Sequence, residues 1–407
     1  MDVKTAFLHG DLEERILMKQ PDGFIKKGDE NKVCLLRKSL YGLKQSPRQW
    51  NIKFDSFMKE ANFIRSEYDQ CVYMRNIHNE KAVYLLLYVD DILIASGSMS
   101  EIRSVKDSLS SKFEMKDMGK ASRILGMDII RDRERGTLQL SQESYIEKVL
   151  KTFGMTEAKP TTTPLATHFR LKSLTKDERK EEAVHMEDTP YASAVGSLMY
   201  AMIGSRPDIA YAVGVISRFM SNPGRDHWTA VKWVLRYLRG SSKASLTFTK
   251  DKSFSIDGFC DSDYATDLDR RRSVTGFIFQ VWGNTVSWRS NLQSVVALST
   301  TEAEYMALSI AVKEAIWLKG LCSELGFDAG AVKIHCDSQS ALALAKNSVY
   351  HERTKHIATK YHFIRDIVAD GIVELFKIHT SKNPADFLTK ALPGPKFELC
   401  RELAKVA

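Results

Sequence analysis

Residues 82–96, AVYLLLYVDDILIAS, place two adjacent aspartates inside an otherwise apolar run. The apolar segments on either side have the composition of short strands, which predicts two strands joined by a tight turn. Burying a carboxylate is costly unless it is paired or bound to a metal ion. We therefore expect Asp90 and Asp91 to lie at a hairpin turn and to serve as metal ligands, with a solvated turn as the alternative.

The composition predicts a multidomain protein with a polyanionic partner. The chain has 407 residues, 43% of them hydrophobic, and a formal net charge of +8, which is enough for two or three domains. Its six cysteines are scattered without zinc-binding spacing, which favours reduced thiols and a cytoplasmic or nuclear location. No apolar run approaches the roughly 20 residues that span a bilayer, so we expect no membrane partner.

The order of elements predicts α/β and α+β domains. Residues 1–135 mix short helices and strands, and residues 136–245 are mainly helical, with a charged loop at 166–190. In residues 250–407, three strands precede a long helix beginning near residue 300. A strand, two helices, another strand and a terminal helix that opens at NPADFLTKAL follow. This last part is expected to be an α/β domain.

Four acids in the last domain stand where an element begins or ends: Asp261, Glu304, Asp337 and Asp386. Each could instead be a helix cap or a favourable charge in a first helical turn. Together they are the hard oxygen ligands that Mg²⁺ or Mn²⁺ needs from several elements. Two such ions would support cleavage of a phosphodiester.

Neighbouring acids leave two ligand choices open. Asp263 competes with Asp261 on the same strand, and Glu302 competes with Glu304. Residues two apart on a helix differ by about 200° in direction, so both glutamates cannot face one site. In the first domain, Asp2 could join Asp90 and Asp91 from a neighbouring strand, giving three carboxylates around a second pair of ions.

Long motifs through the whole chain resemble the reverse transcriptase and RNase H of the Pol polyprotein of copia-type LTR retrotransposons. In the first part these are MDVKTAFLHGDLEERILMKQPDGF, LRKSLYGLKQSPRQW and YVDDILIA, followed by GSLMYAMIGSRPDIAYAV and VLRYLRG. In the last part they are DSDYATDLDRRRSVTGFIF, STTEAEYMAL, IHCDSQSAL, HERTKHI and NPADFLTKAL.

The resemblance implies a reverse transcriptase palm at 1–135, a thumb-like or connection-like region at 136–245, and an RNase H-like domain at 250–407. It implies RNA-directed DNA synthesis from an RNA template, a DNA primer and dNTPs, and hydrolysis of RNA in RNA–DNA hybrids. Two Mg²⁺ or Mn²⁺ ions are implied at each site. The implied catalytic and metal-binding residues are Asp2, Asp90, Asp91, Asp261, Glu304, Asp337 and Asp386.

Further residues are candidates for contact with nucleic acid. By the resemblance, Gly42, Gln45, Ser46 and Pro47 lie under the template and the incoming nucleotide. Around the last domain's first strands, candidates for contact with the hybrid are Arg272, Ser273, Thr275, Ser290 and Gln293. A helix ending at VLRYLRG offers Lys232, Arg236 and Arg239. The alternatives are a polar hairpin surface and a solvated helix face.

The chain begins one residue before Asp2, whereas the family has a fingers region before that point. The resemblance therefore implies an amino-terminally truncated polymerase, with an Asp2 that frays unless neighbouring strands hold it. We expect hybrid cleavage to be better preserved than DNA synthesis. The alternative hypothesis is a non-catalytic nucleic-acid-binding remnant of a degenerate transposon.

Overall fold

The computed structural model describes residues 1–76, 82–250, 253–346 and 358–407. The segment HERTKHI therefore lies outside the described residues. The chain divides into two compact units, which are described separately: Met1–Ala121 with Leu321–Phe327, and Ser122–Gly320 with Asp328–Ala407. None of the described helices is both long enough and apolar enough to cross a membrane.

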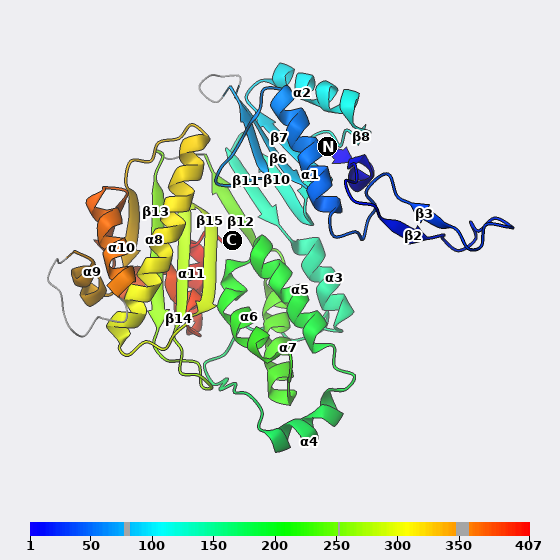
Figure 1. The fold of residues 1–407 in the computed structure, drawn as a ribbon. Coiled ribbons are helices and arrows are strands. Elements are labelled where there is room, and N and C mark those ends of the chain that lie inside the picture. Colours follow the sequence, from blue (N-terminus) through cyan, green and yellow to red (C-terminus); the bar gives the residue numbers. More distant parts are fainter. Residues whose placement is uncertain (77–81, 251–252, 347–357) are drawn as a thin grey trace. The chain divides into compact units, whose positions relative to one another are not determined.

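The first unit is built on a six-stranded sheet in the order β4-β5-β6-β7-β1-β8 (Figure 1). Its strands are β1 (Asp2–Val3), β4 (Ile64–Arg65), β5 (Val72–Arg75), β6 (Val83–Tyr88), β7 (Asp91–Ser96) and β8 (Met115–Lys116). Helices α1 (Ser46–Glu60) and α2 (Met99–Lys112) share one core with the sheet, and Trp50, Phe54 and Leu109 are almost fully buried there. A 3-10 turn (Ala6–His9) follows β1. The two-stranded ribbon of β2 (Leu17–Lys19) and β3 (Val33–Leu35) is mostly exposed.

The stretch at residues 82–96 forms the predicted hairpin. Strands β6 and β7 pair from Val83 with Ser96 to Tyr88 with Asp91, leaving Val89 and Asp90 as a two-residue turn. Val89 has a φ of 57°, because two-residue hairpin turns require a left-handed backbone. The Trp50 indole N–H donates to Val89 O at 2.6 Å, which ties the turn to α1.

The second unit begins with a four-stranded antiparallel sheet in the order β12-β11-β10-β9. Its strands are β9 (Arg123–Ile124), β10 (Met127–Asp132), β11 (Thr137–Ser141) and β12 (Ser245–Thr249). Leu125 and Gly126 have φ values of 48° and 69°, so the sequence SRILGMDII makes a hairpin instead of one continuous strand.

A group of packed helices lies between β11 and β12 in the sequence. They are α3 (Glu143–Thr152), α4 (Lys176–Met186), α5 (Tyr191–Gly204), α6 (Ala210–Ile216) and α7 (Arg225–Gly240), with 3-10 turns at Pro207–Ile209 and Ser217–Phe219. The fully buried Arg206 guanidinium donates to both carboxylate oxygens of Asp208 and to Ser241 O. Tyr237 OH also donates to Asp208, at 2.6 Å. These bonds satisfy charges that would be costly to bury alone.

Helix α4 corrects the expectation of a loop over residues 166–190. The Thr175 hydroxyl accepts from Glu178 N, and the Glu178 carboxylate accepts from Thr175 N at 2.7 Å. This capping box starts a helix in a segment whose many charged residues had favoured a solvent-exposed loop. The helix buries no residue, so its sequence has no periodic apolar positions from which a helix could be predicted.

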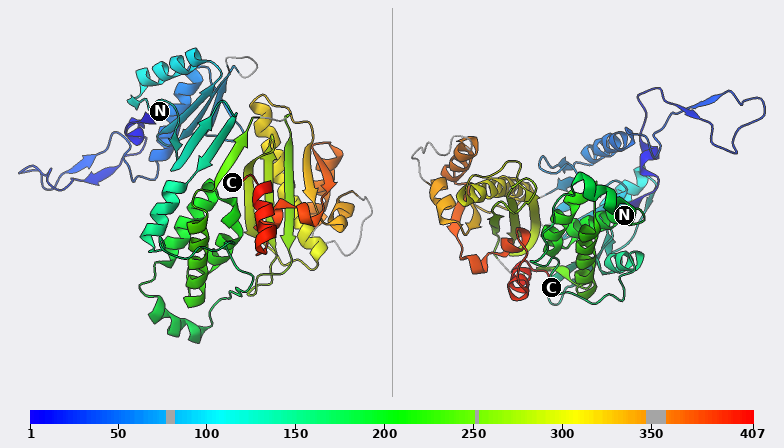
Figure 2. Two further views of the ribbon diagram at one scale, coloured as in Figure 1. Left: turned by 180° about the vertical axis from the view of Figure 1, so that it is seen from behind. Right: turned by 90° about the horizontal axis from the view of Figure 1, so that it is seen from below.

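The last part of the chain is a five-stranded sheet in the order β15-β14-β13-β16-β17. The three predicted strands are β13 (Ile256–Asp263), β14 (Val274–Val281) and β15 (Asn284–Leu292), all antiparallel neighbours. Strands β16 (Val332–Cys336) and β17 (Val373–Lys377) add in parallel. Helices α8 (Thr300–Glu324) and α11 (Gly394–Leu403) lie on opposite faces of this sheet (Figures 1 and 2), while α9 (Gln339–Lys346) and α10 (Ala358–Ala369) connect β16 to β17.

The end of the chain differs from the predicted terminal helix. Short 3-10 segments span Thr380–Lys382 (η5) and Pro384–Leu388 (η6), and α11 starts only at Gly394. Pro393 is extended, with φ −61° and ψ 148°, and a proline also disfavours helical backbone in the residue before it. Asp386 therefore lies on a 3-10 turn and not in an α-helix.

Candidate metal-binding carboxylate site

Two neighbouring parallel strands bring Asp261 and Asp337 together. Cys260 of β13 is paired with Cys336 of β16, and each is followed directly by one of the two acids. Asp261 is 1% exposed, whereas Asp337 comes just after the end of its strand and is half-buried. The ends of parallel strands meet at one edge of a sheet, so this register places two carboxylates side by side.

Asp386 is brought to the same place by a turn that attaches to β13. The buried Asn383 accepts from Ala385 N at 3.1 Å through its side-chain oxygen, and its amide group donates to Cys260 O at 2.9 Å. The turn also packs closely on β14. A Cβ at Gly276, which is paired with Asp261, would lie 2.7 Å from Leu388 Cβ, so only glycine fits there without movement.

The carboxylates of Asp261, Asp337 and Asp386 form one compact group. Each contributes an oxygen, and these oxygens all lie within 4.8 Å of one another. A second group, formed by Glu304, Cys336 and Asp337, satisfies the same limit and shares Asp337 with the first. The structure thus brings together the four acids of the last domain that the sequence singled out.

Burial perturbs the acids of this site. Burial raises the pKa of Asp261 to about 6, against the opposing effect of Lys390, and the nearby Asp386 raises it further. Burial also raises the pKa of Glu304, and Asp261, Cys336 and Asp337 add to the rise. Both pKa values rise because the charged forms of Asp261 and Glu304 are poorly hydrated and lie close to other acidic groups.

In the described part of the chain, the buried oxygens Glu304 Oε2 and Asp386 Oδ1 accept no hydrogen bond, although Lys390 Nζ lies 3.4 Å from Asp386 Oδ1. Unsatisfied buried oxygens are unusual in folded proteins and call for a ligand or an ion. Oxygens bound to one Mg²⁺ at 2.0–2.1 Å can be at most about 4.2 Å apart, so the compact group needs only a small contraction. The donors therefore fit a hard divalent cation.

The structure distinguishes Glu304 from Glu302. The carboxylate of Glu302 accepts from Leu298 N at 2.7 Å, so it is engaged at the start of α8. Glu304 faces Asp261 and Asp337, which contribute to its pKa. Asp263 lies on the wall of a separate small cavity with Lys390, outside both compact groups.

The sequence did not single out Thr389 and Lys390, although both contact the site. The Thr389 hydroxyl donates to Asp261 Oδ2, and Lys390 Nζ lies 3.3 Å from the same oxygen. Lys390 Nζ also lies 3.4 Å from Asp386 Oδ1. Lys390 follows Asp386 by four residues in the quoted NPADFLTKAL motif, and this short spacing was the available signal.

The acids of the first unit meet less closely. Asp2 on β1 is paired directly with Asp91 on β7, and Val3 N donates to Asp90 O at 2.8 Å. Strand β8 pairs with the other side of β1, so strands on both sides hold Asp2. Burial raises the pKa of Asp91, and Asp90 and Asp2 raise it further. Among the described residues, however, these three acids do not form a group with all ligand oxygens within 4.8 Å.

The candidate template-contacting residues lie before and in the first turn of α1. Gly42 has a φ of 98° and is exposed, as is Pro47 near the helix start. The Gln45 amide donates to Glu14, and the buried Ser46 hydroxyl donates to Leu40 O. Their contact with nucleic acid stays a prediction.

Three of the candidate hybrid contacts are buried. The Gln293 amide donates to Ser262 Oγ, to Thr275 Oγ1 and to Ala303 O, and Ser273 Oγ accepts from Ala265 N. Ser273, Thr275 and Gln293 are each at most 3% exposed, so this placement favours a structural role over direct contact. Their sequence neighbour Arg272 is partly exposed and remains available.

On α7, Arg236 and Arg239 are partly engaged. Their Nε atoms donate to the backbone oxygens of Lys159 and Thr156, at 2.7 and 2.5 Å. Lys232 is exposed on the same helix. These bonds hold the loop beside the helix. Contact of Lys232, Arg236 and Arg239 with nucleic acid stays a prediction.

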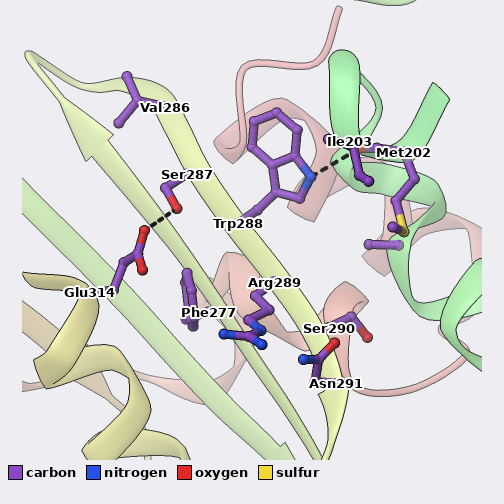
Figure 3. A pocket seen from close by; sticks show the side chains of 11 residues that line it. Met202, Ile203, Phe277, Val286, Ser287, Trp288, Arg289, Ser290, Asn291 and Glu314 are labelled. Carbon is purple, nitrogen blue, oxygen red and sulfur yellow. Dashed lines mark hydrogen bonds between the residues drawn. The ribbon is translucent and has the colours of Figure 1, made fainter. Parts of the chain in front are cut away.

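A separate pocket of about 390 Å³ lies along β15 (Figure 3). Trp288 Nε1 donates to Met202 O across it, and Ser287 Oγ donates to Glu314 at 2.6 Å (Figure 3). The candidate contact Ser290 lines this pocket, but its hydroxyl donates to Leu388 O. None of the four acids lines it, so it is distinct from the carboxylate site.

Comparisons with known proteins point to one family. A family model described as reverse transcriptase (RNA-dependent DNA polymerase) matches residues 1–167. A retrovirus-related Pol polyprotein from transposon TNT 1-94 of Nicotiana tabacum is 53% identical over 99% of this chain and 30% of its own length. The Pol polyprotein from transposon RE1 of Arabidopsis thaliana is 37% identical over 98% of this chain and 26% of its own.

A putative transposon Ty5-1 protein of Saccharomyces cerevisiae is 34% identical over 77% of this chain and 100% of its own length. The chain spans less than a third of the length of the two plant Pol polyproteins. Among solved structures, LC11-RNase H1 from compost is 20% identical, with a TM-score of 0.27, over 33% of this chain and 92% of its own.

Proposed function

We propose that this chain, which belongs to the Pol polyprotein family of copia-type LTR retrotransposons, hydrolyses the RNA strand of RNA–DNA hybrids at the Asp261 site. The observation that carries the proposal is the compact group of Asp261, Asp337 and Asp386, with Glu304 beside it. Buried carboxylate oxygens that accept no hydrogen bond in the described structure support the binding of divalent cations there.

Two Mg²⁺ or Mn²⁺ ions are proposed, because two overlapping ligand groups share Asp337. When bound, such ions activate a water molecule and stabilise the leaving oxygen of a phosphodiester. Asp261, Asp337 and Asp386 would hold one position, and Glu304 with Asp337 the other. The Cys336 thiol is a poor ligand for a hard cation, so its place near Glu304 adds little to magnesium binding.

The neighbouring side chains orient the ligands. Thr389 fixes one oxygen of Asp261, and Asn383 fixes the turn that carries Asp386. A ligand held by a second layer of hydrogen bonds needs little reorganisation when a cation enters. In this proposal the RNase H-like part comprises residues 250–407, and partly exposed Arg272 would contact phosphates of the hybrid.

RNA-directed DNA synthesis at Asp2, Asp90 and Asp91 is the second candidate function. The direct pairing of Asp2 with Asp91 and the adjacent turn at Asp90 favour it. We propose that this activity is weaker than hybrid cleavage, because the three acids do not reach the same mutual proximity in the described structure. The palm-like part would comprise residues 1–135, with the thumb-like or connection-like part at 136–245.

The test is cleavage of a labelled RNA–DNA hybrid by the purified chain in Mg²⁺ or Mn²⁺. We expect cleavage of the RNA strand, loss of cleavage in EDTA, and loss in Asp337→Asn. Asp370→Asn is the matched control, because Asp370 is an exposed acid of the same part of the chain. Retained hybrid binding without cleavage in either metal would instead support a non-catalytic nucleic-acid-binding remnant.

A further inference from the structure

Lys390 places a positive charge against two of the proposed metal ligands. Its Nζ lies 3.3 Å from Asp261 Oδ2 and 3.4 Å from Asp386 Oδ1, so it bridges carboxylates from β13 and η6. The side chain is 33% exposed, whereas those of Asp261 and Asp386 are 1% and 3% exposed. The ammonium group therefore approaches two buried acids from the solvent side.

Lys390 and a divalent cation compete for the same pair of acids. Asp261 and Asp386 are two of the three members of the compact group. An ammonium group this close to their oxygens repels a cation that enters between them, and the repulsion is strong where water is scarce. A cation can reach its full set of ligands only if Lys390 moves away.

The partners of Lys390 differ from those of the other lysine at the site. Lys396 Nζ lies 3.3 Å from Asp386 Oδ2 and also donates to the backbone oxygens of Thr380 and Ser381, at 2.9 and 2.8 Å. Within the part of the chain that the structure describes, the Lys390 ammonium group contacts carboxylates alone. Lys396 is thus bound to the backbone, whereas the contacts of Lys390 in the described residues are with charges that a cation would neutralise.

The structure also offers the displaced ammonium another acid. A cavity of about 180 Å³ is lined by both Lys390 and Asp263. Asp263 lies outside the compact group but is close enough to raise the pKa of Lys390, although burial opposes the rise and Asp261 and Asp386 contribute more. A lysine on a flexible stem can move between such partners and solvent without losing its charge.

We propose that Lys390 is the built-in counter-ion of the metal-free site, holding Asp261 and Asp386 together until a divalent cation displaces it. This inference depends on the proposed function for the identity of the incoming ion. It makes Lys390 a positioning residue that sets how strongly the site binds metal. No proton is transferred, since the ammonium stays charged in both positions.

The experiment measures Mn²⁺ binding to the full chain by calorimetry and by the electron paramagnetic resonance signal of free Mn²⁺. Lys390→Met should bind Mn²⁺ roughly tenfold more tightly than the original chain, because the competing charge is removed. Lys390→Arg keeps the charge and should not show this gain. Lys382→Met is the matched control, because Lys382 is an exposed lysine on η5. The Mn²⁺ affinity of this variant should equal that of the original chain.

Thermal unfolding supplies a second readout. In EDTA, Lys390→Met should melt at a lower temperature than the original chain, because buried carboxylates lose their counter-ion. Saturating Mn²⁺ should remove most of that difference. If Lys390→Met does not fold in EDTA, Lys390→Gln replaces it in the same two measurements.

The outcomes separate this inference from the proposed function. Mn²⁺ affinity that is unchanged or weaker in Lys390→Met and Lys390→Gln overturns the counter-ion role, even if hybrid cleavage is observed. If the original chain binds no Mn²⁺ but Lys390→Met does, the counter-ion role is supported and the metal-dependent function of this chain is rejected. If neither binds Mn²⁺, both are rejected.

Discussion

The two groups of acids show different ways of placing carboxylates. Four separate places in the fold supply the acids of the last domain, which converge on a largely buried site. Asp261 lies on a strand, Asp337 directly follows a strand, Asp386 lies on a 3-10 turn and Glu304 on a helix. Asp90 and Asp91 come from a single hairpin, and Asp2 comes from the strand beside it. All three acids of the hairpin group are only half-buried.

The difference shows what convergence requires. Packing between separate elements can bring their acids within a few ångströms of one another, because the packing contacts offset the repulsion between the charges. Gly276 and Asn383 do this for Asp386 by letting η6 lie directly on the sheet. A hairpin fixes the backbone of its acids by ladder hydrogen bonds, but it leaves their side chains freer to point into solvent.

The largest expected effect is the selective loss of one activity when an acid of one group is replaced. Asp261→Asn should lower hybrid cleavage by roughly a thousandfold or more, because it removes a charge that metal ligation requires. The same substitution should leave primer extension on an RNA template unchanged. Asp91→Asn should have the opposite pattern, measured by the same two assays. Loss of both activities in either variant would show that the two groups are not independent.

The next prediction concerns the packing that brings Asp386 to the site. Gly276→Val should displace η6, since a Cβ would already lie 2.7 Å from Leu388 Cβ and 2.8 Å from Thr389 Cγ2. A small displacement of a ligand can cost about a hundredfold in rate, and overpacking costs about 1–3 kcal/mol of stability. Cleavage kinetics and urea unfolding measure the two losses. Gly196→Ala, where nothing lies within 4 Å, should lose neither.

The third prediction concerns how the free energy of unfolding of the metal-free chain depends on pH. The pKa of Asp261 is raised from 3.8 to about 6, so its protonated form is favoured in the folded state. Its contribution to stability is complete below pH 4 and is lost as the pH rises through about 6. In EDTA, Asp261→Asn should therefore flatten the fall in the free energy of unfolding between these pH values. An unchanged pH profile would contradict the burial-driven shift.

The smallest expected effect concerns the hairpin turn. Trp50→Phe removes the N–H that donates to Val89 O and should cost about 1 kcal/mol in the free energy of unfolding. Primer extension should fall more than hybrid cleavage, because only the hairpin group depends on that turn. Equal losses in the two assays would argue against a local effect.

The sequence predicted much of this arrangement because the relevant signals were local. Apolar runs located β6, β7 and β13 to β16. Asp90 lies in the turn between β6 and β7 and Asp337 directly follows β16, whereas Asp261 lies inside β13, which continues to Asp263. Choosing Glu304 over Glu302 followed the resemblance, and the structure gives the reason in the bond from Leu298 N to Glu302.

The remaining features depend on contacts between distant segments. The four-residue spacing from Asp386 is a weak local signal for Lys390, whereas its contact with Asp261 joins residues that are 129 positions apart. The buried positions of Thr275 and Gln293 likewise follow from their bond to each other across two segments. Helix α4 was missed because it lacks an apolar face, although its capping box is visible in the sequence.

The bond from the Asn383 amide to Cys260 O joins residues that are 123 positions apart. During synthesis, the strand bearing Asp261 leaves the ribosome long before the turn bearing Asp386, and the chain emerges at about 5–20 residues per second. Several seconds therefore pass in which β13, β14 and β15 of the nascent polypeptide can pair while Asp386 is still missing from the carboxylate group. A newly made molecule can therefore hold a cation at the compact group only after the turn that bears Asp386 has docked on β13.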